Sequence, residues 1–130
     1  MIDRYSREEM ASKWTYQAKY QAWLDVEKAV VKAWARLGKI PQEDADKIVA
    51  NANFDIKRID EIEAVTRHDL IAFTTSVSET LGDESRWFHY GMTSSDTIDT
   101  AVAVQMKDSL ELVIEDVKMI MESIKKRAME

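Results

Sequence analysis

Apolar side chains recur every three or four residues along most of this 130-residue chain, which is the spacing of one helix face. The first such stretch covers about residues 12–37. Gly38 follows it, and glycine readily adopts the left-handed conformation found just after helix ends. The pattern predicts one amphipathic helix with an apolar face made of Trp23, Val26, Val30, Ala33, Trp34 and Leu37.

Two shorter helices are predicted next. Pro41 suits the first position of a helix that reaches about Asn51, because the missing N–H of proline has no helical partner there. A further helix, capped by Asn53 or Asp55, carries isoleucines at three-residue spacing. It is expected to break at the sequence TRHD, residues 66–69.

A fourth helix is predicted to begin at Asp69, which is well placed to cap it, and to reach Leu81. Gly82 is expected to end it. The sequence DESRWFHYG, residues 83–91, then predicts a loop or a single turn.

The last helix is predicted from Ser94 to the end of the chain. Its apolar positions alternate steps of four and three, as in the seam of a helix bundle, and a second set widens the apolar surface. The two sets are Met106, Leu110, Val113, Val117, Ile120 and Ile124, and then Leu112, Ile114, Met119 and Met121. At 1.5 Å per residue this helix is about 55 Å long, so we expect other chains to cover part of it.

These patterns predict an all-α protein, since three glycines and one proline leave few interruptions. We expect an N-terminal helical domain over residues 1–92, followed at residues 93–130 by the first part of a long central-bundle helix. The last helix contains no glycine, asparagine or proline that would end it. We therefore expect this chain to be the front piece of a larger protein.

Charge and composition exclude several classes of function. A formal net charge of −6 gives no general attraction to nucleic acid or to an anionic membrane. The chain has no cysteine, and neither of its two histidines has a companion at metal-binding spacing, so no metal site is expected. The N-terminal residues lack the apolar core of a signal peptide, and the default expectation is a cytoplasmic protein.

The sequence TSSD, residues 93–96, is a candidate anion site at the start of the last helix. Free backbone N–H groups in a first helical turn, with hydroxyls beside them, suit a carboxylate or a phosphate. The alternative is simple capping by Thr93, Ser94 or Ser95, with Asp96 complementing the helix dipole. Spacing alone leaves both interpretations open.

Three further groups are candidates for chemistry. In TRHD, a histidine beside an aspartate can be held in one tautomer for proton transfer, or the aspartate only caps a helix. His89 has aromatic neighbours on both sides, which is typical of a part-buried structural histidine. Arg4, Tyr5 and Arg7 form a small cluster that can bind a phosphate or remain solvated.

Three motifs in order carry a resemblance to a known family. They are RYSR at residues 4–7, TRHDLIAF from residue 66 and HYGMTSSDTIDTA from residue 89. Together they resemble the N-terminal part of the adenylosuccinate lyases, which belong to the fumarase and aspartase superfamily. Argininosuccinate lyases and carboxymuconate cycloisomerases have a comparable helix-start motif, but RYSR and TRHD favour the adenylosuccinate enzymes.

The resemblance implies a carbon–nitrogen lyase of purine biosynthesis. Such an enzyme eliminates fumarate from adenylosuccinate to give AMP, and from the succinylated aminoimidazole carboxamide ribotide to give the free carboxamide. No metal or organic cofactor is implied, and the partner is a small nucleotide substrate. A homotetramer is also implied, with a core of long helices and active sites built from three subunits.

The same resemblance implies substrate-binding roles for Arg4, Tyr5, Arg67, His68, Asp69, Thr93 and Ser94. The first two resemble residues that hold the nucleotide end, the next three a second binding strip, and the last two the contacts to the succinyl part. His68 is also the candidate catalytic residue, either assisting protonation or binding phosphate. His89 is a further candidate to line the pocket.

The family's principal catalytic histidine and its serine base lie beyond residue 130, so the resemblance implies that this chain alone is inactive. Two alternatives stay open. One is another fumarate-releasing lyase of the superfamily. The other is a non-catalytic helical oligomerisation module in which TSSD only caps a helix.

Overall fold

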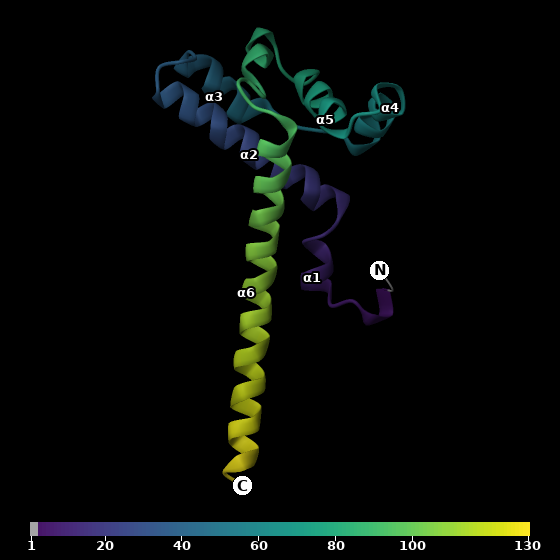
Figure 1. The fold of residues 1–130 in the computed structure, drawn as a ribbon, viewed down its shortest axis with the longest axis vertical. Coiled ribbons are helices and arrows are strands. Elements are labelled where there is room, and N and C mark those ends of the chain that lie inside the picture. Colours follow the sequence, from purple (N-terminus) through teal and green to yellow (C-terminus); the bar gives the residue numbers. More distant parts are fainter. Residues whose placement is uncertain (1–2) are drawn as a thin grey trace.

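A computed structural model describes residues 3–130. These residues form helices joined by turns, without a strand, which confirms the predicted all-α class. The elements are η1 Asp3–Tyr5, α1 Glu8–Ser12, α2 Tyr16–Arg36, α3 Gln42–Asn51, α4 Ile56–Thr66, α5 Asp69–Ser78, η2 Asp83–Trp87 and α6 Ser94–Ala128. Helices α2 to α5 gather around the start of α6, and the rest of α6 extends away from them (Figure 1).

The first predicted helix is divided in two. Residues 13–15 separate α1 from α2, because Thr15 caps α2 by accepting a 3.1 Å hydrogen bond from the Ala18 N–H. Gly38 follows α2 with φ +66°, as predicted for a left-handed residue after a helix. Pro41 is the N-cap of α3 and not its first residue, a shift of one position.

The fourth predicted helix begins and ends differently from the prediction. His68, and not Asp69, is the N-cap of α5, and its Nδ1 accepts a 3.3 Å hydrogen bond from the Ile71 N–H. The helix ends at Ser78, because the hydroxyl and the N–H of Thr80 both donate to the Val77 carbonyl. Gly82 therefore does not end it.

The core lies where α2 crosses the other helices. Tyr20 of α2 stacks on Phe73 of α5 with ring centroids 5.8 Å apart, and Trp23 meets the same ring edge-on at 5.4 Å. The buried face of α2 consists of Tyr20, Trp23, Leu24, Glu27 and Val31. Of the face predicted from the sequence, Trp23 is buried, and Val26 and Trp34 are partly buried against the core. Val30, Ala33 and Leu37 are not part of the core, so the prediction was wrong for half of its members.

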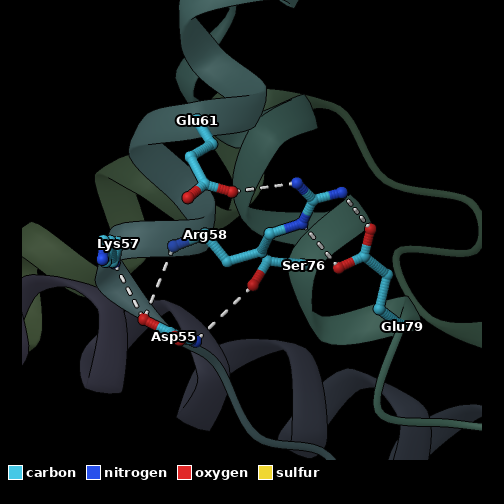
Figure 2. Close-up of polar contacts among 6 residues, drawn as sticks. All are labelled: Asp55, Lys57, Arg58, Glu61, Ser76 and Glu79. Carbon is cyan, nitrogen blue, oxygen red and sulfur yellow. Dashed lines mark hydrogen bonds and ion pairs between the residues drawn. The ribbon is translucent and has the colours of Figure 1, made fainter.

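An ion-pair network joins α4 to α5. Arg58 donates two hydrogen bonds to Glu79, of 2.8 and 2.9 Å, and one of 3.0 Å to Glu61 (Figure 2). The guanidinium lowers the pKa of the Glu79 carboxyl below its usual value by donating to it. Asp55 caps α4, and its own N–H donates to the Ser76 hydroxyl of α5. These contacts orient the junction that carries the TRHD sequence.

Helix α6 has one buried stripe, made of Thr97, Ala101, Gln105 and Ser109. The Trp14 indole donates to the Ser109 hydroxyl at 3.1 Å, and Gln105 donates to the Lys13 carbonyl at 2.8 Å, so the N-terminal segment is held along α6. All the predicted seam residues except Leu112 are exposed. In residues 3–130 no helix is long and apolar enough to cross a membrane.

Candidate functional site

The start of α6 has a partly completed cap. Thr93 is the N-cap, and the Asp96 carboxylate accepts the Thr93 N–H at 2.9 Å, as in a capping box. The half-buried Ser94 makes no hydrogen bond through its hydroxyl to any of residues 3–130. The N–H groups of Ser94 and Ser95 have no helical acceptor, because they belong to the first turn. Thr93 and Asp96 therefore do the capping, and Ser94 has free donors for an anion.

His89 reaches into the core just before this helix. Its Nδ1 lies 2.7 Å from Oε1 of Glu27, and the Thr97 hydroxyl donates to the same oxygen at 2.7 Å. The Glu27 side chain is 0% exposed and the His89 side chain 24% exposed. The expectation of a part-buried histidine is confirmed.

Glu27 was not predicted as a site residue, although its position in the helix pattern could have revealed it. It lies three residues after the buried Leu24 and four before the buried Val31, so it occupies a core position of α2. An acid at such a position is uncommon, because burying an ionised carboxylate is costly without partners. Its Oε2 has no hydrogen-bond partner among the described residues.

The α4–α5 junction presents Arg67, His68 and Asp69. Nδ1 of His68 accepts the Ile71 N–H and lies 3.7 Å from the Asp69 carboxylate, which itself accepts the Leu70 N–H at 2.7 Å. Neutral His68 therefore carries its proton on Nε2, the ring nitrogen that the helix leaves free. The backbone of α5 therefore sets this tautomer, and not Asp69, which the sequence left as one of two possibilities.

Backbone strain coincides with the predicted site. Within residues 3–130, the non-glycine residues with positive φ are Arg67, at 54°, and His89, at 62°. A left-handed conformation costs an L-residue about 1 kcal/mol or more. Such strain tends to occur at functional positions, and here it occurs in the TRHD motif and at the start of HYGMTSSD.

The N-terminal cluster lies far from the start of α6. Arg4 and Tyr5 are exposed in η1, and the Arg4 guanidinium lies 4.8 Å from the Tyr5 ring centre. Arg7 forms an ion pair with Asp116, which is about 33 Å beyond Ser94 along α6 at 1.5 Å per residue. Three residues span at most about 11 Å. The N-terminal cluster is therefore held well beyond the start of α6 (Figure 1).

The three predicted groups of binding residues are not joined to one another. Within residues 3–130, no hydrogen bond or ion pair links the N-terminal cluster, the TRHD motif and the start of α6.

An open groove of about 910 Å³ runs between α2 and α6, and its walls include Val26, Val30 and Trp34 from the predicted face of α2. None of the predicted binding residues lines this groove. Arg67 instead borders a shallow hollow of about 370 Å³ with Asp60 and Glu63. Nowhere in residues 3–130 do three or more metal-binding side chains gather.

Curated adenylosuccinate lyases match the whole chain. The adenylosuccinate lyase of Helicobacter pylori, strain ATCC 700392 / 26695, is 55% identical over 130 residues. The adenylosuccinate lyase of Bacillus subtilis, strain 168, is 49% identical over 130 residues. In each case the match covers 100% of this chain and 30% of the relative, so the chain spans about a third of their length.

Solved structures share the fold. A fumarate lyase from Mesorhizobium sp. BNC1 superimposes with a TM-score of 0.80 at 24% identity, covering 87% of this chain and 27% of that one. The β-carboxy-cis,cis-muconate cycloisomerase of Acinetobacter calcoaceticus sp. ADP1 also gives 0.80, at 22% identity, covering 94% and 30%. Residues 3–130 match the protein family described as Lyase. Because that match includes nearly every residue, the chain belongs to this lyase family.

Proposed function

We propose that this chain is the N-terminal part of an adenylosuccinate lyase, an enzyme that releases fumarate from adenylosuccinate and from the succinylated carboxamide ribotide. The observation that carries this proposal is the identity of 49–55% along all 130 residues to proteins of that name. The motifs that carry the resemblance also contain both strained non-glycine residues of the described range.

The proposed reaction is a β-elimination. A base removes a proton from the succinyl carbon next to a carboxylate, and the electron pair left on that carbon forms the double bond of fumarate. The bond from the neighbouring carbon to nitrogen breaks, and the nitrogen takes up a proton as the amine leaves. Negative charge develops on the carboxylate during proton removal, and donors placed around it lower the barrier.

Ser94 and the start of α6 are proposed to hold that carboxylate. The Ser94 hydroxyl has no partner among residues 3–130, and the first-turn N–H groups carry the positive end of the helix dipole. Thr93 is proposed to contact the same part of the substrate. Capping by Asp96 is compatible with this role, because within residues 3–130 its carboxylate accepts only the Thr93 N–H.

Arg67, His68 and Asp69 are proposed as a second binding strip. His68 presents a free Nε2–H, which can donate to a substrate oxygen or assist protonation. Arg4 and Tyr5 are proposed to hold the nucleotide end. No metal or organic cofactor takes part in this scheme.

We propose that complete sites form in a homotetramer. Two features support this: Arg7 is anchored to Asp116, about 33 Å along α6 from Ser94, and apolar side chains lie exposed along α6. Neighbouring chains would then supply Arg4 to one another's sites, and their α6 helices would cover the exposed apolar side chains. The isolated 130-residue chain is accordingly expected to be inactive.

A chimaera tests the proposal. This chain replaces the matching 130 residues of the Bacillus subtilis relative, and fumarate release from adenylosuccinate is followed by absorbance. Turnover is expected from the chimaera and not from the 130-residue chain alone. A folded tetrameric chimaera that releases no fumarate would contradict the proposed substrate. Robust turnover by the short chain would contradict the need for neighbours.

A further inference from the structure

Packing does not account for the acid at position 27. Glu27 is 0% exposed in the core face of α2, and its Oε2 has no partner among the described residues. A buried acid with one unsatisfied oxygen destabilises a fold relative to an apolar side chain of similar size. Leucine or methionine would fill this position without that loss. The carboxylate therefore needs a role that an apolar residue cannot perform.

The geometry around Glu27 determines the tautomer of His89. Oε1 accepts from the Thr97 hydroxyl at 2.7 Å and lies 2.7 Å from His89 Nδ1, the length of a charge-assisted hydrogen bond. An ionised carboxylate can only accept hydrogen bonds, so the proton of this contact lies on Nδ1 of His89. Nε2 remains free of hydrogen bonds to residues 3–130. His68 has the opposite arrangement, because its Nδ1 is an acceptor.

We propose that Glu27 is a positioning residue, which holds His89 with its proton on Nδ1 and its Nε2 available to a ligand beside the start of α6. The proposal rests on the proposed function, in which that helix start binds the succinyl part of the substrate. Thr97 belongs to α6 and bonds the same oxygen, so the carboxylate ties the His89 ring to both α2 and α6. These bonds also hold the left-handed backbone of His89, at φ 62°.

The tautomers can be read directly, because the chain has two histidines. Histidine-selective ¹⁵N labelling of the 130-residue chain, with two-bond ¹H–¹⁵N correlation spectra above neutral pH, reports which ring nitrogen is protonated. We expect Nδ1 to be protonated in His89 and Nε2 in His68. Glu27→Met should change the pattern of His89 alone, with His68 as the internal control. Glu27→Gln, whose amide oxygen still accepts, should keep the Nδ1 proton.

Two results would overturn the proposal: a neutral Nε2–H form of His89 in the unaltered chain, or an unchanged His89 pattern in Glu27→Met. The unaltered chain decides the first question even if a variant fails to fold. Thr97→Val is the matched control, because it removes the other bond to Oε1 and leaves the histidine's acceptor in place. It should retain the Nδ1 proton.

Kinetics of the chimaera test the consequence for the reaction. Glu27→Met should lower kcat/KM about tenfold or more, the loss expected when the orienting partner of a functional histidine is removed. Glu27→Gln should recover part of this loss, because its amide oxygen still accepts from His89. Equal kcat/KM in Glu27→Met and the unaltered chimaera would refute the positioning role. If the unaltered chimaera releases no fumarate, the proposed function fails, while the NMR spectra still decide whether Glu27 orients His89.

Discussion

The indole N–H of Trp34, on α2, donates a 2.9 Å hydrogen bond to the backbone carbonyl of Tyr90, in the loop that precedes α6. The Trp34 ring also meets the Tyr90 ring edge-on, with centroids 6.1 Å apart. Gly91 follows with φ +72°, and a Cβ there would lie 3.2 Å from the Trp34 ring. The indole thus holds the loop that presents His89 and the start of α6.

Gly91→Ala is predicted to destabilise the chain more than Gly38→Ala. Both glycines have positive φ, +72° and +66°, but a Cβ at Gly38 would meet nothing within 4 Å. Gly38→Ala should lower the free energy of unfolding by about 1 kcal/mol through backbone strain. Gly91→Ala should cost at least about 1 kcal/mol more, because the Trp34 ring has to move. Urea unfolding of the two variants provides the comparison, and equal midpoints would show that the indole does not hold the loop.

Ser94→Ala in the chimaera is predicted to lower kcat about a hundredfold, the typical loss when a donor to a developing charge is removed. The fold should be unchanged, since the Ser94 hydroxyl bonds to none of residues 3–130. Ser95→Ala is the matched control, because Ser95 is the exposed neighbour in the same turn. Steady-state kinetics and circular dichroism measure both effects. Equal kinetics in the two variants would remove Ser94 from the proposed site.

The exposed apolar face of α6 is predicted to make the 130-residue chain self-associate. Ile120 is 57% exposed in the single chain, and burying such a side chain contributes about 1.5–3 kcal/mol. Ile120→Glu should therefore weaken association at least about tenfold in sedimentation equilibrium. Val65→Glu adds the same charge at an exposed apolar position of α4 and should leave association unchanged. A monomer at all concentrations, or equal effects of both variants, would argue against α6 as the interface.

Tyr20 is predicted to make the fold sensitive to alkali. Burial, assisted by the negative charges of Glu63, Asp60 and Asp69, raises the pKa of the Tyr20 phenol from 10.0 to about 12. The unfolded chain loses the phenol proton at a lower pH than the folded chain does. The contribution of Tyr20 to the free energy of unfolding is therefore complete below about pH 10 and is lost as the pH rises toward 12. The loss is about 2–3 kcal/mol at high pH.

Urea unfolding between pH 9 and 12, with phenolate absorbance, checks this expectation. Tyr20→Phe should remove the loss, whereas Tyr5→Phe, at an exposed tyrosine, should retain it. Identical pH profiles of Tyr20→Phe and the unaltered chain would contradict the assignment.

The sequence alone determined most of the helices of this protein. Apolar spacing, Gly38 and the sequence TSSD predicted α6 and the end of α2 correctly, because helix hydrogen bonds and caps join residues at most four apart. The motifs TRHD and HYGMTSSD, also identified from the sequence, contain the strained residues Arg67 and His89.

Only the tertiary structure decided which side of α2 is core. The helix has apolar residues on two faces, so its spacing did not distinguish the core face from the one that lines the groove with α6. The pairing of Glu27 with His89, 62 residues apart, was likewise beyond local patterns. Contacts between distant residues depend on how whole helices cross, and no interaction within one helix encodes that crossing.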